Sequence, residues 1–132
     1  MGARHKARKR ALDILFEADQ RGVAIADVMA GREQQSELSA NPYTVLLVSG
    51  VVEHSDDIDA MIETHAVDWT LDRMPAVDRA VLRLGTFELC WAPEKIAPAV
   101  VIDEAVELAK ELSTDDSPSF VNGVLGRIAA EG

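Results

Sequence analysis

The residues best suited to chemistry in this chain are the basic side chains among its first ten residues. Five cations stand there with no carboxylate among them: Arg4, Lys6, Arg8, Lys9 and Arg10. Basic blocks at a terminus usually act as interaction arms, and their usual targets are phosphate groups. The other 122 residues carry 8 basic side chains against 23 acidic ones. The cluster therefore predicts a local site for a polyanion on an otherwise acidic protein.

This basic cluster conflicts with the dipole of the helix that it would begin. Exposed cations in a first turn oppose the dipole at about 0.3–1 kcal/mol each, and such conflicts tend to mark functional sites. A frayed terminus that only aids solubility is the alternative. We expect instead an arm that orders on RNA or DNA, with guanidinium groups meeting phosphates and bases. Five neutralised phosphates would give a log–log salt slope of at most about −3.5 on single strands, which favours a co-binder.

No catalytic or metal-binding pattern accompanies the arm. His5, His54 and His65 are too scattered in the sequence for a metal-ligand spacing. The acidic pairs at 56–57 and 115–116 fit helix starts, where carboxylates are favoured electrostatically, better than they fit a cation site. No serine stands in a nucleophile-elbow sequence, and no glycines have a phosphate-cradling spacing. We therefore expect no catalysis, no cofactor and no metal.

Cysteine content and apolar stretches indicate a cytoplasmic protein. Cys90 is the only cysteine, so an intramolecular disulfide cannot form and a reducing compartment is expected. The longest apolar stretch, 45–52, is far below membrane-spanning length. The apolar residues that follow the arm include Asp13 and Glu17, which a signal peptide would not carry there.

The elements that must position the arm are helices, because no alternating apolar and polar run is long enough for a strand. Gly22 is suited to end the first helix, and Pro42 and Pro118 are suited to begin later ones. Ser55 is an expected N-cap. We expect an all-α single domain of about seven helices in two small bundles. The division falls near residues 55–75, and the later helices occupy 24–39, 42–53, 55 onward, 76–91, 99–112 and 118 onward.

Three blocks of the C-terminal half have the order and spacing of a known family. They are WTLDRMPAVDRAVLRLGTFEL (69–89), PAVVIDEAVELAK (98–110) and DDSPSFVNGVL (115–125). Together with ARHKARKRALDILFEAD (3–19), they make the chain resemble the NusB family of transcription antitermination factors. The resemblance covers essentially the whole chain and is weakest at 24–42.

The resemblance implies an all-helical fold of two three-helix bundles and no enzyme activity. It implies binding of boxA, a single-stranded element of nascent RNA, jointly with NusE, which is also a small-subunit ribosomal protein. The pair would act in the RNA polymerase antitermination complex, notably on ribosomal RNA operons. Some members of the family self-associate, so a homodimer is a further expectation.

The resemblance also suggests roles for individual residues. The five basic residues of the arm match the family's RNA-contacting segment, and Asp116 and Phe120 match a block near the RNA. The alternatives are a cap of the last helix for Asp116 and a core position for Phe120. Phe16 and Glu88 match positions at the NusE interface, although a buried or intrahelical ion pair is the alternative for Glu88. Separately, Asn122 and Gly123 are expected at a close helix crossing.

Two other functions stay open at this point. A similar helical domain precedes the catalytic part of some ribosomal RNA cytosine methyltransferases, so the chain could act with a separate methyltransferase. Alternatively, it could be a protein-interaction module whose arm touches an acidic protein or an anionic lipid. RNA binding and liposome binding would separate these functions.

Overall fold

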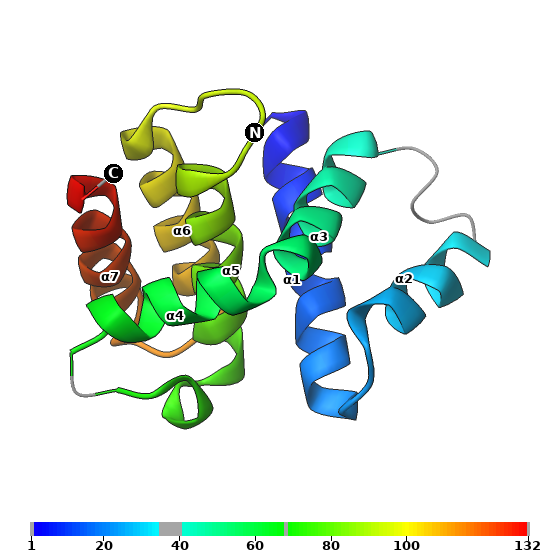
Figure 1. Ribbon diagram of the computed structural model, residues 1–132, viewed down its shortest axis with the longest axis horizontal. Helices are drawn as coiled ribbons and strands as arrows, with labels where there is room; N and C mark the ends of the chain where they lie inside the picture. Colours follow the sequence, from blue (N-terminus) through cyan, green and yellow to red (C-terminus); the bar gives the residue numbers. More distant parts are fainter. Residues whose placement is uncertain (1, 35–40, 68, 132) are drawn as a thin grey trace.

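The protein is all-α, as the sequence predicts (Figure 1). A computed structural model describes residues 2–34, 41–67 and 69–131. Its elements are α1 (Ala3–Arg21), α2 (Ile25–Gln34), α3 (Pro42–Glu53), α4 (Ser55–His65), the 3₁₀ helix η1 (Leu71–Arg73), α5 (Ala76–Cys90), α6 (Pro98–Leu112) and α7 (Ser117–Glu131).

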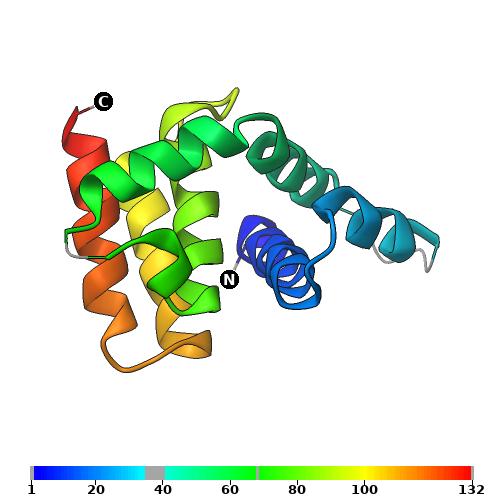
Figure 2. The same cartoon turned by 60° about the horizontal axis from the view of Figure 1, so that its bottom comes forward.

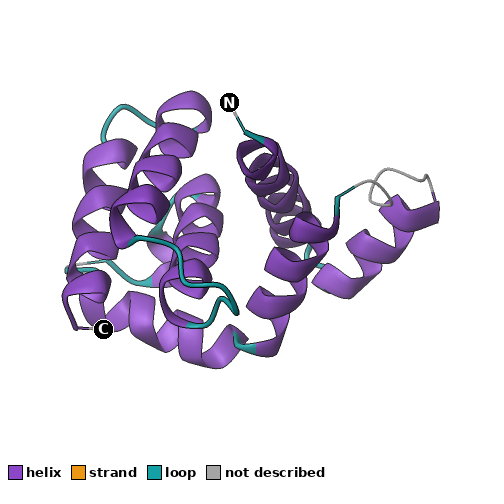
Figure 3. Ribbon diagram, turned by 90° about the horizontal axis from the view of Figure 1, so that it is seen from above, coloured by secondary structure: helices purple, strands orange, loops and turns teal. Residues whose placement is uncertain are grey.

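Helices and loops account for the whole of the described chain, and Figure 3 draws no strand in it. The expected seven helices are present, and the sequence missed only the short η1 between α4 and α5. Part of the expected helix 24–39 lies outside the described residues, because α2 is followed by the undescribed 35–40. No helix of the described part is long and apolar enough to cross a membrane.

Local sequence signals set several helix ends. Gly22 ends α1 with a φ of 65°, a left-handed conformation that glycine adopts without a Cβ penalty. Pro42 and Pro98 stand in the first turns of α3 and α6, where the missing N–H costs nothing. Each of these positions is a predictable boundary.

The start of α4 corrects one expectation. Ser55 is the first helical residue rather than the N-cap, and the N-cap position belongs to His54, whose side chain makes no capping bond. Asp56 and Asp57 do occupy the first turn, where their charge favours the dipole. The acidic first turn was therefore predictable, but the helix begins one residue earlier than the sequence indicated.

The core is organised around α5, which packs against α1, α3, α4, α6 and α7. The sequence places apolar residues on nearly every side of α5, and a helix that is apolar on most sides is expected at the centre of a fold. In Figure 2 α1 lies between two groups of helices. The C-terminal helices α5, α6 and α7 are on one side, and α2 and α3 are on the other. The largest side chains that are completely enclosed come from five helices: Leu12, Ile14, Leu47, Ile58, Ile62, Leu82, Leu125 and Ile128.

Close helix crossings involve different glycines from the one expected. A Cβ on Gly50 would come within 2.1 Å of Phe87 Cε1, so α3 and α5 need glycine there. A Cβ on Gly85 would come within 2.8 Å of Leu125 Cδ1. By contrast, a Cβ on Gly123 would meet only the guanidinium of Arg127, at 3.4 Å, and Asn122 is exposed. The predicted crossing at Asn122 and Gly123 is therefore wrong.

Helix packing bears on the expected division near residues 55–75, which stays a prediction. Helix α1 packs against both α2 and α3, and α4 packs mainly against α5 and α7. Because α1 and α3 also pack against α5, the two groups share one continuous core. The arm at 1–10 is therefore carried by a helix that is anchored in both groups.

Candidate nucleic-acid interface

The basic arm is the first part of α1, and its cations fall on two faces of that helix. His5, Ala7 and Arg8 are buried, while Arg4, Lys6 and Arg10 are exposed and Lys9 is partly exposed. We call the side that carries His5 and Arg8 the inner face. The exposed surface formed by Arg4, Lys6, Lys9 and Arg10 is the outer face; Arg4 stands one turn before Arg8 and lies at the edge of this surface, next to the inner face. No acidic residue stands in the first turn of α1 to offset these charges locally. The carboxylates that offset the positive charges must therefore come from other parts of the fold.

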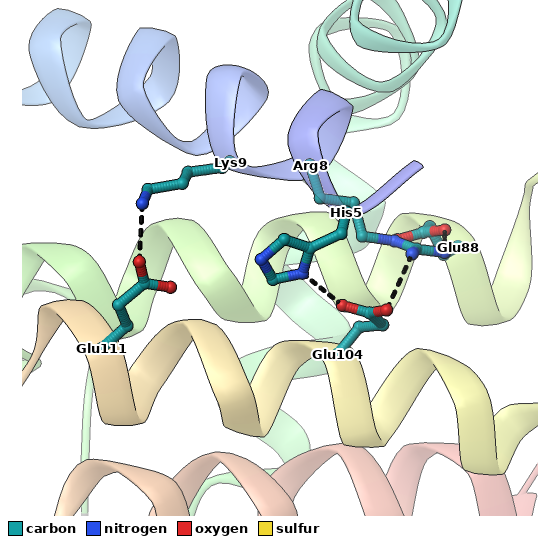
Figure 4. A network of polar contacts seen from close by, with 6 residues as sticks. All are labelled: His5, Arg8, Lys9, Glu88, Glu104 and Glu111. Atoms are coloured by element: carbon teal, nitrogen blue, oxygen red, sulfur yellow. Dashed lines mark hydrogen bonds and ion pairs between the residues drawn. The ribbon is translucent and has the colours of Figure 1, made fainter. Parts of the chain in front are cut away.

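On the inner face the compensating charge is the Glu88 carboxylate of α5, which pairs with Arg8 (Figure 4). Nε and Nη2 of Arg8 each donate to one carboxylate oxygen at 2.8 Å, which is the bidentate arrangement. The two side chains are only 5% and 2% exposed. Burial alone would lower the pKa of Arg8, but the hydrogen bonds and charge of Glu88 outweigh burial and raise it. The pair is a buried, charged joint between α1 and α5.

Tyr43 of α3 completes this joint. Its hydroxyl donates to Glu88 Oε2 at 2.6 Å, and its ring lies 4.7 Å from Arg4 Cζ and 5.9 Å from Arg8 Cζ. Burial, and then the hydrogen bond to Glu88, raise the pKa of Tyr43, so the phenol stays protonated and keeps donating. Three helices, α1, α3 and α5, therefore meet at one carboxylate.

His5 and Glu104 extend the inner face toward α6. His5 Nδ1 lies 2.7 Å from Glu104 Oε2, and Arg8 Nη1 lies 3.7 Å from Glu104 Oε1. Figure 4 shows His5 and Arg8 both pointing to the same glutamate. The sequence separates His5 from Glu104 by 99 positions, so local reading could not pair them. His5, considered from the sequence only as a metal ligand, is part of the interface between α1 and α6.

Exposed acidic residues face the outer cations. Lys9 Nζ lies 2.6 Å from Glu111 Oε1, and Arg4 Nη2 lies 2.6 Å from Glu94 Oε2. The hydrogen bond from Lys9 lowers the pKa of Glu111 and raises that of Lys9. All four side chains are at least 42% exposed, so solvent screens these pairs and an incoming phosphate can replace the carboxylate. The outer face is a set of accessible cations with weakly held partners.

The loop before α7 places Asp116 and Phe120. Asp78 of α5 accepts hydrogen bonds from Ser113 at 2.5 Å and from Ser117 at 2.9 Å, which fixes this loop to the core. Asp116 is exposed just before α7, and Phe120 is partly buried against the core. The roles expected for these two residues in RNA binding stay predictions.

Phe120 has an aromatic neighbour that the sequence did not point to. Trp69, which is 46% exposed, lies with its ring centroid 6.2 Å from that of Phe120, at an angle of 61°. This edge-to-face arrangement is one of the geometries that aromatic pairs prefer. The position of Trp69 between α4 and α5 was the sequence signal that could have pointed to this aromatic pair.

The two positions expected at a protein interface differ in accessibility. Phe16 is 37% exposed on α1, so its side chain can meet a partner. Glu88 is 4% exposed and is held by Arg8 and Tyr43, so in this conformation it cannot. The same burial keeps Arg8 from RNA unless it gives up Glu88. The contacts expected of Arg8 and Glu88 stay predictions, and the geometry supports the buried pair that the sequence left open for Glu88.

Sequence reading missed the acidic partners of the arm. Glu104 and Glu111 stand seven positions apart on α6 and therefore share one face of that helix. That spacing was a usable signal, whereas Glu94 in the loop before α6 gave none. No group of three potential metal ligands comes together in the described ranges. The arrangement can bind an anion along the outer face of α1 and holds that helix through its inner face.

Comparisons with known proteins agree on one family. The sequence model described as NusB family matches residues 5–130. The transcription antitermination protein NusB of Saccharopolyspora erythraea is 60% identical over 133 residues, covering 100% of this chain and 90% of that protein. The protein of the same name from an Arthrobacter species is 52% identical, covering 97% of this chain and 93% of that protein. Those relatives therefore have little length left over for a catalytic domain.

Solved structures give the same fold. T. maritima NusB superposes with a TM-score of 0.87 at 33% identity, covering 98% of this chain and 92% of that one. A chain from a complex of the antitermination factors NusB and NusE with double-stranded RNA gives a TM-score of 0.81 at 30% identity. That match covers 99% of this chain and 100% of the other.

Proposed function

Since the chain belongs to the NusB family, we propose that it is a transcription antitermination factor that binds boxA of nascent RNA together with NusE. Through this complex with RNA polymerase it promotes read-through of ribosomal RNA operons. Its curated relatives carry the name transcription antitermination protein, and a solved relative was captured with NusE and RNA. We infer that it acts in the cytoplasm by binding and without catalysis.

The outer face of α1 is the observation that supports this proposal best. Arg4, Lys6, Lys9 and Arg10 project there from a helix that the inner face ties to α3, α5 and α6. RNA phosphates would replace Glu94 and Glu111 as partners of Arg4 and Lys9. Such phosphate contacts set the register of an RNA strand without reading its sequence. The net charge of −10 repels RNA elsewhere and so favours binding at this one surface.

Recognition of a particular RNA sequence also requires protein side chains that contact the bases. We propose Asp116 and Phe120 for this role, because a carboxylate accepts from base edges and an aromatic ring stacks on bases. Phe16 is the exposed side chain on α1 proposed for contact with NusE. The acidic remainder of the chain favours association with a basic ribosomal protein.

A titration of labelled boxA RNA tests the proposal. The variant Lys6→Ala/Lys9→Ala/Arg10→Ala changes the outer face and leaves Arg8 in place. It should weaken binding at physiological salt and reduce the log–log salt slope by about 2, because three phosphate contacts are lost on a single strand. Lys110→Ala is the matched control, since Lys110 is an exposed cation on α6. It should leave affinity and slope unchanged.

The outcome also separates the competing functions. Equal affinities for the triple variant and the Lys110 control would rule out the outer face as the RNA site. Binding to anionic vesicles with no binding to boxA RNA would support the interaction-module function instead. Repeating the titration with duplex RNA, and with and without NusE, measures strand preference and the contribution of the partner.

A further inference from the structure

Arg4 is an outer cation that also touches the buried joint, through the ring of Tyr43. Its guanidinium carbon lies 4.7 Å from the centroid of the Tyr43 ring, close enough for a cation–π contact. The phenol of Tyr43 is in turn fixed by its 2.6 Å hydrogen bond to Glu88, which Arg8 holds from the other side. Tyr43 therefore has a fixed position against the core and carries an exposed cation on its ring.

The partner of Arg4 marks where an anion sits. Glu94 Oε2 lies 2.6 Å from Arg4 Nη2, and the glutamate side chain is 76% exposed in the loop before α6. A guanidinium over an aromatic ring keeps the N–H donors along its edge, so it can hold the ring and an anion at once. An exposed carboxylate of this kind is readily displaced by a phosphate.

We infer that Tyr43 is a positioning residue for RNA binding, which holds the Arg4 guanidinium at a site for one RNA phosphate. Glu94 occupies that site when RNA is absent. The inference rests on the proposed function and extends it to a residue outside the arm. A free arginine loses much of its rotamer freedom when it binds, and an arginine already held on a ring loses less. Tyr43 thus strengthens binding without touching the RNA.

A double-mutant cycle between Tyr43 and Arg4 tests the inference with labelled boxA RNA. Tyr43→Leu should weaken binding about two- to ten-fold, because the freed Arg4 side chain must then be ordered when RNA binds. In an Arg4→Ala background, the same change should have no further effect, because the cation that Tyr43 holds is gone. Tyr43→Phe keeps the ring and should retain at least half of the wild-type affinity. Circular dichroism of each variant confirms that it is folded.

Different results would overturn the inference. An equal loss from Tyr43→Leu with and without Arg4 would mean that Tyr43 acts on the fold as a whole. No loss in the wild-type background would mean that Arg4 needs no positioning.

A readout without RNA distinguishes this inference from the proposed function. The NMR signals of the Arg4 side chain should carry a ring-current shift in the free protein that Tyr43→Leu removes and Tyr43→Phe retains. Unshifted Arg4 signals would overturn the positioning role whether or not RNA binds. Shifted signals in a protein that does not bind boxA RNA would instead count against the proposed function.

Discussion

The two faces of the arm use the same residue types in opposite ways. On the inner face, Arg8 and Glu88 form an ion pair whose side chains are 5% and 2% exposed. On the outer face, the adjacent residue Lys9 pairs with Glu111, and both side chains are 42% exposed. Both pairs join α1 to the C-terminal helices. The comparison teaches that exposure, rather than charge or sequence proximity, separates a structural cation from one available to a ligand.

Breaking the inner pair should have the largest effect. Arg8→Ala leaves the Glu88 carboxylate buried without its charged partner, which typically costs about 3–5 kcal/mol. Urea unfolding followed by circular dichroism measures the free energy of unfolding. Lys9→Ala is the matched control on the outer face and should not shift the midpoint measurably.

A second variant tests whether the loss comes from the unpaired charge. Replacing both partners, as Arg8→Met/Glu88→Leu, removes both buried charges at similar volume and should recover most of the stability. If Arg8→Ala and Lys9→Ala had equal midpoints, the distinction between the two faces would be wrong.

Glu104 offers an intermediate case, because its side chain is 28% exposed and contacts both His5 and Arg8. Glu104→Gln keeps the shape and removes the charge, and should lower the free energy of unfolding by about 1 kcal/mol. The same urea experiment measures it. A loss as large as that of Arg8→Ala would show that the comparison depends on charge number instead of burial.

On the outer face, Glu111→Gln should change binding rather than stability. Under the proposed function Glu111, the partner of Lys9, competes with RNA for it, so its neutralisation should tighten binding of boxA RNA about two-fold at low salt. The gain should vanish at high salt, where exposed pairs are screened. Fluorescence anisotropy at two salt concentrations measures this. Unchanged affinity at low salt would mean that Glu111 is no competitor.

The smallest effect concerns a histidine pair outside the arm. Hydrogen bonding to the Met61 carbonyl, and then to Glu131, outweighs burial and raises the pKa of His65. A raised pKa stabilises the fold fully below the ordinary histidine value of about 6.5, and this stability is lost as pH rises through the folded pKa. The free energy of unfolding should therefore fall as the pH rises above about 6.5.

Glu131→Gln isolates this contribution. The variant should show a smaller fall in stability over the same pH range, because the charged partner of His65 is gone. A pH dependence identical to that of the wild type would exclude the pair as its source. The pH dependence of stability would then come from another titratable group.

Most of the fold was predictable because its determinants are local. Gly22 and Pro42 mark helix ends through their own backbone preferences, and the apolar face of α1 follows from helical spacing. Ser55 was misplaced because several polar residues can serve at a helix start. Gly123 was misjudged because a close crossing depends on the opposing helix, and it is Gly50 that faces Phe87.

The sequence by itself determined the all-helical fold and the concentration of positive charge at the start of α1, since composition and periodicity carry both. The tertiary structure decided which of these cations remain available. Arg8 meets Glu88 across 80 positions, and Lys9 meets Glu111 across 102. No local sequence pattern predicts contacts between residues so far apart in the chain, because burial depends on how helices distant in sequence pack together. The packing of α3, α5 and α6 against α1 divided one basic cluster into a buried ion pair and an exposed set of cations.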